Sequence, residues 1–598
     1  MLSKKNYYNK FFVIFVLGII VVTFSACENP FYSDNGDYVL EINREGEGTV
    51  DPETGKHSYS SDDITPVSLE VEPDEGWYFY RWEGNVVEPY LKESKIFVDR
   101  NRSVRAVFDQ FTTGFYSYDL NYNFDGITLP GVDEKDDVFT IVFSRGDYPL
   151  HYSMRELSAN IEGEINNNQE TYIDKNINKT VNIEDEQYDT WVSGTPEVNR
   201  DDEEQIKKIK ETRNMTDDFE HFKSQEEESE FVVGDSDEFY LFYDEEGNDK
   251  RHEKEAELLL SEDEIMIWAV KDWIEDENID IEDLRKAVNS LKDEFKDYRV
   301  DIKEYFGREP SADYYPVLTS RPEINILLAP FGSRLGGYFF SGDLIESSSS
   351  NERKILYVNS KYYNVEEQKF SESTHGIIAH EYQHLLFLNE KVLSGRPPEV
   401  DDIWINEGFS ELAMDIAGYG YMKGFRDNTV KNYVKNSAST SLVFWNEGDD
   451  YEAELEDYGI SYLFARYLYD CYGKDIIQAV STSEKIPQKA LAEATDISFD
   501  KLFADWAKAF LAAIMGYQDF ENGYGEDGPE FSEEWLEDLA LQLEPGKGYS
   551  ENVIPWGVSF AEIVVSENNG DENNLVIDVE DTVDEGDFMK NVLRWKGE

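Results

Sequence analysis

Three of the seven histidines in this 598-residue chain, His375, His380 and His384, lie within ten residues of one another. The stretch around them is rich in apolar residues and favours a buried helix. On a helix, His380 and His384 lie one turn apart on the same face. The side that packs into a core would carry Ile377, Ile378, Leu385 and Leu388. The histidine pair thus fixes one buried helix, with two imidazoles pointing the same way.

This spacing suits a metal site. Two imidazoles one turn apart can both reach one Zn²⁺ ion at about 2.0–2.1 Å. Glu381 adjoins the first of them, so its carboxylate can meet a metal-bound water without binding the metal. His375 is not at ligand spacing and is interpreted as a helix-entry residue. The competing interpretation is a helix whose two histidines are exposed or hydrogen-bonded and hold no metal.

A second segment completes the pattern. Residues 404–411 read Trp-Ile-Asn-Glu-Gly-Phe-Ser-Glu, and residues 380–385 read His-Glu-Tyr-Gln-His-Leu. Together they resemble the hyicolysin-type neutral metallopeptidases of the Glu-zincin superfamily, over about 231–525. The resemblance implies one catalytic zinc bound by His380, His384 and Glu407. It also implies hydrolysis of peptide bonds by metal-activated water, with Glu381 as general base.

Further roles follow from the same resemblance. In thermolysin-like enzymes, the acid at the position of Glu411 orients a ligand histidine through its second ring nitrogen. Alternatively, Glu411 is the third ligand and Glu407 is structural. Several Glu-zincins stabilise the oxyanion with a Tyr or His beyond the third ligand; Tyr458 is the candidate here, and Tyr462 is held in reserve.

The substrate is expected to pair through its backbone with an edge strand. Gly336, Gly337 and Tyr338 are the candidate strand, because glycine permits close approach of another chain. The ordinary alternative for this stretch is a β-turn.

The N-terminus resembles a lipoprotein signal. Lysines precede an apolar run from Phe11 to Phe24 that ends in Ser-Ala-Cys at Cys27. This is the order of a secretory signal, and the run is short for a membrane span. Lipidation of Cys27 would anchor the protein in the cell envelope, outside the cytoplasm. A plain signal peptide, giving a secreted protein, and an uncleaved anchor are the alternatives.

The next segments form a tether, 28–36, and a β-rich module, 37–109. The module resembles one copy of the internalin-B-type repeat, through Gly46-Glu47-Gly48, the run from Gly76 to Gly84 and the strand Val104 to Phe108. Such modules are often spacers, and a binding role for carbohydrate or protein is the alternative.

The remaining chain divides into 110–230, 231–525 and 526–598. The first is β-rich and contains an acidic insertion over 166–230, interpreted as flexible and solvated. Ca²⁺ is possible there, but no Asp-x-Asp-x-Asp-Gly loop supports it. Residues 231–525 would form the peptidase domain, with strands at 231–233, 324–328 and 355–358 and a helix capped by Asp280. The last region is mixed or β-like. The expected fold class is α+β: a zincin-like catalytic domain of a mixed sheet plus active-site helices, preceded by small all-β modules.

The net charge of the chain limits the classes of partner that it can bind. The chain carries 127 acidic against 55 basic residues, a formal net charge of −72. This excludes nucleic acid as an expected partner, because phosphate binding needs a basic face. We expect a monomer that acts on protein or peptide substrates and meets the membrane through Cys27. One rival function is a surface adhesin with an inactive zincin domain. Another is an aminopeptidase, against which the chain lacks a Gly-Ala-Met-Glu-Asn-type loop.

Overall fold

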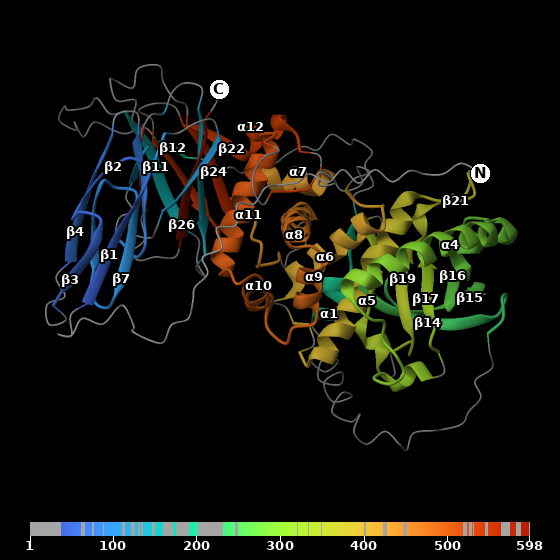
Figure 1. Ribbon diagram of the computed structural model, residues 1–598. Coiled ribbons are helices and arrows are strands. Elements are labelled where there is room, and N and C mark those ends of the chain that lie inside the picture. Colours follow the sequence, from blue (N-terminus) through green and yellow to red (C-terminus); the bar gives the residue numbers. More distant parts are fainter. Residues whose placement is uncertain are drawn as a thin grey trace, which may run out of the picture. The chain divides into compact units, whose positions relative to one another are not determined.

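In the computed structural model, the chain forms two compact units, 1–110 and 111–598 (Figure 1). Its described residues run from 38 to 596 with these gaps: 61–65, 75–76, 88, 111–113, 121–125, 130–131, 133–135, 146–149, 159–171, 175–190, 201–230, 246–248, 320, 333, 348–349, 397, 400–401, 422–426, 447–450, 518–522, 526–528, 530, 544–547, 564–574 and 582–587. The signal segment and Cys27 therefore lie outside the described residues. Within them, no helix is both long and apolar enough to cross a membrane.

The first unit is an all-β module. Its two sheets have the strand orders β3-β1-β7-β5 and β2-β4-β6. The strands are β1 (Tyr38–Glu45), β2 (Gly48–Asp51), β3 (Gly55–Tyr59), β4 (Pro66–Pro73), β5 (Tyr78–Glu83), β6 (Glu93–Phe97) and β7 (Arg102–Asp109). Alternate residues such as Leu69 and Val71 point inward and pack with Trp82 and Phe108. Gly46 adopts φ +80°, where a side chain would strike the Phe108 carbonyl. The predicted β module over 37–109 is thus present.

The second unit contains a pair of five-stranded sheets, ordered β22-β24-β10-β26-β8 and β12-β23-β11-β25-β9. Their strands are β8 (Gly114–Leu120), β9 (Gly126–Leu129), β10 (Asp137–Ser144), β11 (Leu150–Ser158), β12 (Tyr172–Asp174), β22 (Ala540–Leu543), β23 (Gly548–Val553), β24 (Val558–Ile563), β25 (Leu575–Asp581) and β26 (Phe588–Lys596). Both sheets combine strands from 114–174 with strands from 540–596. The structure therefore joins two regions that the sequence-based division at 110–230 and 526–598 treats separately, because strand pairing between distant segments has no local signature.

The other large element of this unit is a seven-stranded mixed sheet, ordered β13-β18-β19-β17-β16-β15-β14. Its strands are β13 (Val192–Ser193), β14 (Ser236–Tyr243), β15 (Asp249–Glu262), β16 (Ile265–Val270), β17 (Ile324–Ala329), β18 (Leu335–Phe339) and β19 (Lys354–Asn359); a small hairpin pairs β20 (Tyr363–Asn364) with β21 (Lys369–Phe370). Every residue of β16, β17 and β19 is buried. These three parallel strands are apolar on both sides because both faces are covered.

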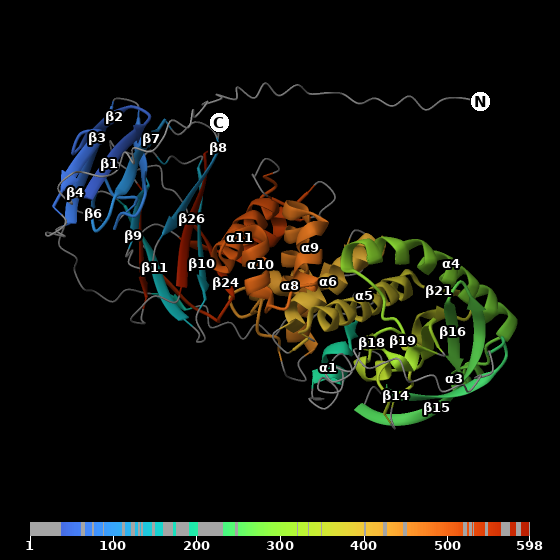
Figure 2. The ribbon, with the colours of Figure 1, turned by 60° about the horizontal axis from the view of Figure 1, so that its bottom comes forward.

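Helices pack on this sheet and continue the chain beyond it. They are α1 (Thr195–Arg200), α3 (Lys271–Asp276), α4 (Ile281–Phe306), α5 (Glu372–Ser394), α6 (Ile403–Ile416), α7 (Asp427–Asn436), α8 (Tyr451–Tyr472), α9 (Lys474–Ser481), α10 (Pro487–Thr495), α11 (Phe499–Ile514) and α12 (Leu536–Leu539). Helices α4 and α5 lie beside each other over one face of the sheet (Figure 2). The Asp280 side chain accepts bonds from the Glu282 and Asp283 amides, which confirms the predicted cap. The mixed α and β character expected from the sequence is confirmed in this coarse form.

Two local expectations are wrong. Residues 231–233 form no strand; the Val232 amide bonds the Asp235 carboxylate, and Gly234 at φ +100° turns the chain before β14 begins. The acidic insertion is not solvated throughout, because Trp191, Val192, Ser193 and Thr195 are buried. Local composition is polar here, but pairing with β18 buries the segment.

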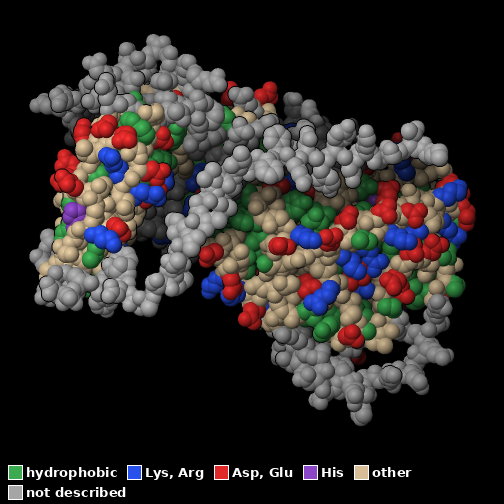
Figure 3. Space-filling model, in the orientation of Figure 1, with side chains coloured by type: hydrophobic (Ala, Val, Ile, Leu, Met, Phe, Trp, Pro, Cys, Tyr) green, Lys and Arg blue, Asp and Glu red, His purple; other side chains and the backbone are tan. Residues whose placement is uncertain are grey.

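The surface of the second unit intersperses acidic and basic side chains (Figure 3). Several are close ion pairs, such as Lys286 with Asp283 at 2.7 Å and Lys296 with Asp263 at 2.8 Å. Exposed pairs of this kind add little stability each. They show, however, that part of the acidic excess is neutralised locally.

A half-buried carboxylate, Glu309, links helices α4 and α5. Arg299 of α4 donates to its two oxygens at 2.7 and 2.8 Å, and the Tyr382 hydroxyl of α5 donates to it as well. Burial alone would raise the pKa of Glu309, but these bonds outweigh it and lower the pKa to about 2. The lowered pKa means that Glu309 stabilises the fold above the unfolded value near 4.5. That contribution is lost as the pH falls toward 2.

We therefore expect Glu309→Gln to lower the free energy of unfolding by about 3 kcal/mol at pH 7. The difference from wild type should narrow below pH 4.5, as seen in urea unfolding at several pH values. Glu304→Gln is the matched control, because Glu304 pairs with Lys474 at the exposed surface and its loss should change stability little. Equal effects of the two substitutions would contradict the assignment of Glu309.

Candidate metal centre

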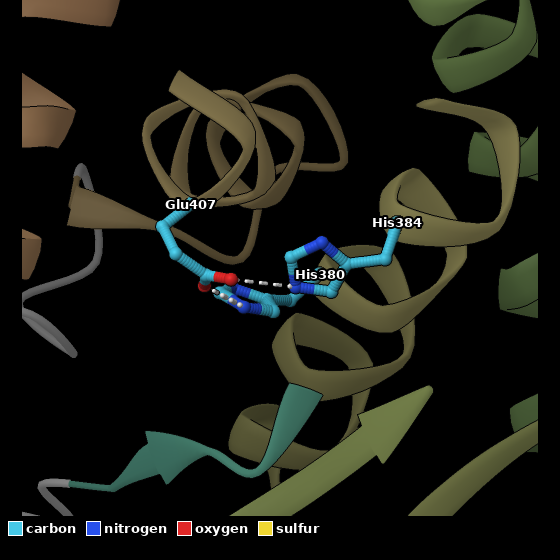
Figure 4. Close-up of side chains that lie close together, drawn as sticks. All are labelled: His380, His384 and Glu407. Carbon is cyan, nitrogen blue, oxygen red and sulfur yellow. Dashed lines mark hydrogen bonds and ion pairs between the residues drawn. The ribbon is translucent and has the colours of Figure 1, made fainter. Parts of the chain in front are cut away.

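Two helices bring three ligand-type side chains together. Helix α5 presents His380 and His384, and α6 presents Glu407 toward both imidazoles (Figure 4). The Nε2 atom of His380 lies 3.1 Å from Glu407 Oε2, and Nε2 of His384 lies 3.3 Å from Glu407 Oε1. All three side chains are buried, and one ligand atom from each lies within 4.8 Å of the others. This is the only such cluster of three or more among the described residues.

Close helix packing sets the position of Glu407. The next residue, Gly408, faces α8, where an added Cβ would lie 2.6 Å from the Ser461 carbonyl oxygen. Only glycine lets α6 approach α8 this closely. The Glu407 side chain lies about 100° around α6 from Gly408, and it points to the histidines of α5.

Polar side chains of α6 lie against both rings. Glu411, one turn beyond Glu407, places Oε1 3.3 Å from Nδ1 of His380. Ser410 Oγ lies 3.2 Å from Nδ1 of His384 and also bonds Gln383. Glu411 therefore lies at the His380 nitrogen that faces away from Glu407, whereas Ser410 lies near both nitrogens of His384, at 3.2 and 3.4 Å. Such neighbours orient ligand imidazoles. Sequence reasoning assigned no role to Ser410, although it lies inside the second motif.

The charges around the three side chains favour a cation. Burial would lower the pKa of His380, but hydrogen bonds to Glu407 and Glu411 raise it to about 9. Burial would likewise raise the pKa of Glu407, but the adjacent imidazoles lower it to about 2. The buried, ionised carboxylate of Glu407 is therefore stabilised by a positive charge beside it. Two imidazole nitrogens and one carboxylate are a common catalytic zinc set, so the residues present fit a zinc ion.

Glu381 lies beside this set and is fully buried, which raises its pKa. Both of its oxygens accept hydrogen bonds, Oε1 from Ser193 Oγ at 2.9 Å and Oε2 from Thr195 Oγ1 at 2.7 Å. These two partners belong to the segment read from the sequence as a solvated insertion. No local pattern marks them, since only the pairing of β13 with β18 carries them to the site.

The two candidate tyrosines, Tyr458 and Tyr462, lie in different surroundings. The Tyr458 ring lies 6.1 Å from that of His380, and its hydroxyl accepts the Ser193 amide at 3.1 Å. Tyr462 instead donates to Asp415 at 2.5 Å. Tyr458 is therefore the tyrosine of the two that the structure brings to the histidines.

The candidate edge strand also reaches the site. Gly336, Gly337 and Tyr338 belong to β18, whose outer side bears only the two-residue β13 among the described residues. A Cβ on Gly337 would lie 3.5 Å from Cγ of Glu381, so this backbone runs directly past the carboxylate. The Tyr338 hydroxyl bonds the Phe242 amide of β14 at 3.0 Å and is directed away from the histidines.

Comparison with known proteins gives two matches. Residues 38–112 match the family described as the divergent InlB B-repeat domain. The chain is also 27% identical over 255 residues to the neutral metalloprotease ShpI of Staphylococcus hyicus. Together with the geometry of the site, this second match supports a metalloprotease-like protein. The alignment covers 38% of this chain and 52% of that protein, so the chain spans about half the length of this relative.

Proposed function

We propose that this protein is a zinc-dependent endopeptidase of the hyicolysin type, with a thermolysin-like zincin fold. The observation that carries the proposal is the buried set of His380, His384 and Glu407 directly beside the carboxylate of Glu381. Similarity to a neutral metalloprotease supports it.

The chain's residues divide the chemistry between them. Zinc held by His380, His384 and Glu407 would supply Lewis-acid polarisation of the scissile carbonyl and acidify the attacking water. Glu381 takes the proton from that water at a carboxylate oxygen and passes it to the leaving amine. The Tyr458 hydroxyl donates to the developing oxyanion. Glu411 and Ser410 keep the two imidazoles in their orientation.

The substrate backbone would lie along β18. Gly336 and Gly337 carry no side chain that would obstruct a chain paired with this strand, and Gly337 passes next to Glu381. Pairing with this strand would bring a peptide carbonyl to the general base without requiring a particular side chain.

For the location, we propose that the protein is attached to the cell envelope through lipid on Cys27, and that it acts on proteins outside the cytoplasm as a monomer. The signal-like sequence before Cys27 supports this. Globomycin-sensitive labelling with a fatty acid would test it, and labelling of a Cys27→Ser variant would contradict it.

A surface adhesin is the second candidate, favoured by the InlB-type repeat at 38–112. In that case the repeat would carry the function and the zincin-like region would be inactive. An aminopeptidase of the same superfamily is a third, and it differs only in needing a free substrate amine.

Removal of the metal tests these proposals together. We expect the purified chain to cleave casein and internally quenched peptides with blocked termini. Chelation with 1,10-phenanthroline should reduce the rate by at least about 100-fold, and added Zn²⁺ should restore it. Activity only on peptides with a free amino end would favour the aminopeptidase. No chelator-sensitive cleavage by the zinc-loaded chain would favour the adhesin.

A further inference from the structure

A short segment of the chain itself fills the proposed substrate position. Residues Trp191 to Thr195 extend along the outer edge of β18, where β13 pairs in parallel. The Val192 amide donates to the Arg334 carbonyl at 3.0 Å, and the Gly194 amide donates to the Gly337 carbonyl at 2.9 Å. The Phe339 amide in turn donates to Thr195 Oγ1 at 2.8 Å. These are backbone groups that an added peptide strand would use.

The same segment engages the groups proposed for chemistry. The Ser193 and Thr195 hydroxyls each donate a hydrogen bond to one carboxylate oxygen of Glu381, at 2.9 and 2.7 Å. The Ser193 amide donates a hydrogen bond to the Tyr458 hydroxyl at 3.1 Å. In Figure 4 the short teal strand of this segment runs below the two histidines, beside β18. General base, oxyanion donor and edge strand are thus all engaged by five consecutive residues.

Trp191 fills a pocket next to the metal ligands. Its ring lies 5.3 Å from the His380 ring and is fully buried. An added Cβ on Gly336 would come within 2.4 Å of the indole, so the pocket is shaped around an aromatic ring by a glycine. If the segment leaves, this pocket becomes available to a substrate side chain.

Two chains cannot hold these positions at once. The edge of β18 has one set of outward amides and carbonyls, and Glu381 has two oxygens. We propose that residues 191–195 are an intramolecular inhibitor that occupies the substrate cleft, and that a peptide binds only when this segment is displaced. The proposal rests on the proposed peptidase function. The pocket vacated by Trp191 then takes an aromatic side chain of the substrate.

The first experiment loosens the segment in the full chain. Ser193→Ala with Thr195→Val removes both hydroxyls from Glu381 and preserves side-chain size. We expect kcat/KM for a blocked peptide to rise roughly tenfold or more, as two bonds to a carboxylate are lost. Ser58→Ala with Thr49→Val, on the exposed surface of the first unit, is the control and should leave the rate unchanged. A fall in rate would mean that the segment positions Glu381, and would overturn the proposal.

The second experiment supplies the segment from outside. A synthetic peptide of residues 190–200 should inhibit the Ser193→Ala, Thr195→Val variant. The same peptide with Ala in place of Trp191 should inhibit less. Stimulation by the peptide would show a structural strand being restored, and would overturn the proposal.

The third experiment does not depend on activity. Fluorescein-labelled 190–200 peptide should bind the double variant at least about tenfold more tightly than wild type in fluorescence polarisation, because the cleft is less occupied. Equal affinities of the peptide for the double variant and the wild type would overturn the proposal that the segment is an inhibitor. If the wild-type chain and all variants lack chelator-sensitive cleavage, the peptidase function fails, while this binding difference still decides whether the segment blocks the cleft.

Discussion

Replacing Glu381 with Gln should lower kcat for peptide hydrolysis by about 1,000-fold or more, while the chain keeps one zinc ion. Loss of a general base commonly costs 10²–10⁴-fold in rate. Glutamine has nearly the same shape, so α5 and its two histidines should stay in place. The Glu381 carboxylate accepts hydrogen bonds from Ser193 and Thr195, whereas the Glu407 carboxylate lies against the Nε2 atoms of both histidines.

The measurement pairs kcat on a blocked peptide with zinc content by elemental analysis. Glu372→Gln is the matched control, because Glu372 is an exposed carboxylate in the first turn of the same helix. It should retain both rate and zinc. Casein cleavage by Glu381→Gln at the wild-type rate would remove Glu381 from the mechanism. Loss of zinc from this variant would instead make Glu381 a ligand.

The helix that carries the histidines could be predicted because its signals are local. Four-residue spacing places His380 and His384 on one face, and apolar neighbours bury the other side. The cap at Asp280 is equally local, since one side chain bonds amides two and three residues away. In both cases the physical cause lies within one or two turns of chain.

Other features depend on distant partners and could not be predicted. Ser193 and Thr195 sit in a polar stretch, and they reach Glu381 only because β13 joins β18, more than 140 residues away in sequence. Strand β10 has an evident apolar run, but its neighbours β24 and β26 come from the other end of the chain. The sequence pattern shows that such a strand is buried and does not show what buries it.

The two acids of α6 should differ sharply in what they do for zinc. Glu407 places one oxygen near each Nε2 atom, at 3.1 and 3.3 Å, whereas Glu411 lies 3.3 Å from Nδ1 of His380. A direct ligand supplies part of the binding energy, while an outer hydrogen-bond partner only orients a ligand. Glu411→Gln should therefore weaken zinc binding by roughly 10–100-fold. Glu407→Gln should weaken it by far more and leave the purified chain without zinc.

Competition with a chromophoric zinc chelator would measure both affinities. The pair is well matched, because the two residues lie one turn apart on one helix, are equally buried and lose the same charge. Circular dichroism should show unchanged helix content in both, so that a difference in zinc reports on ligation. The reverse order of affinities would make Glu411 the third ligand, which the sequence alone leaves open. It would also require α6 to turn, since in the present arrangement only Glu407 contacts both rings.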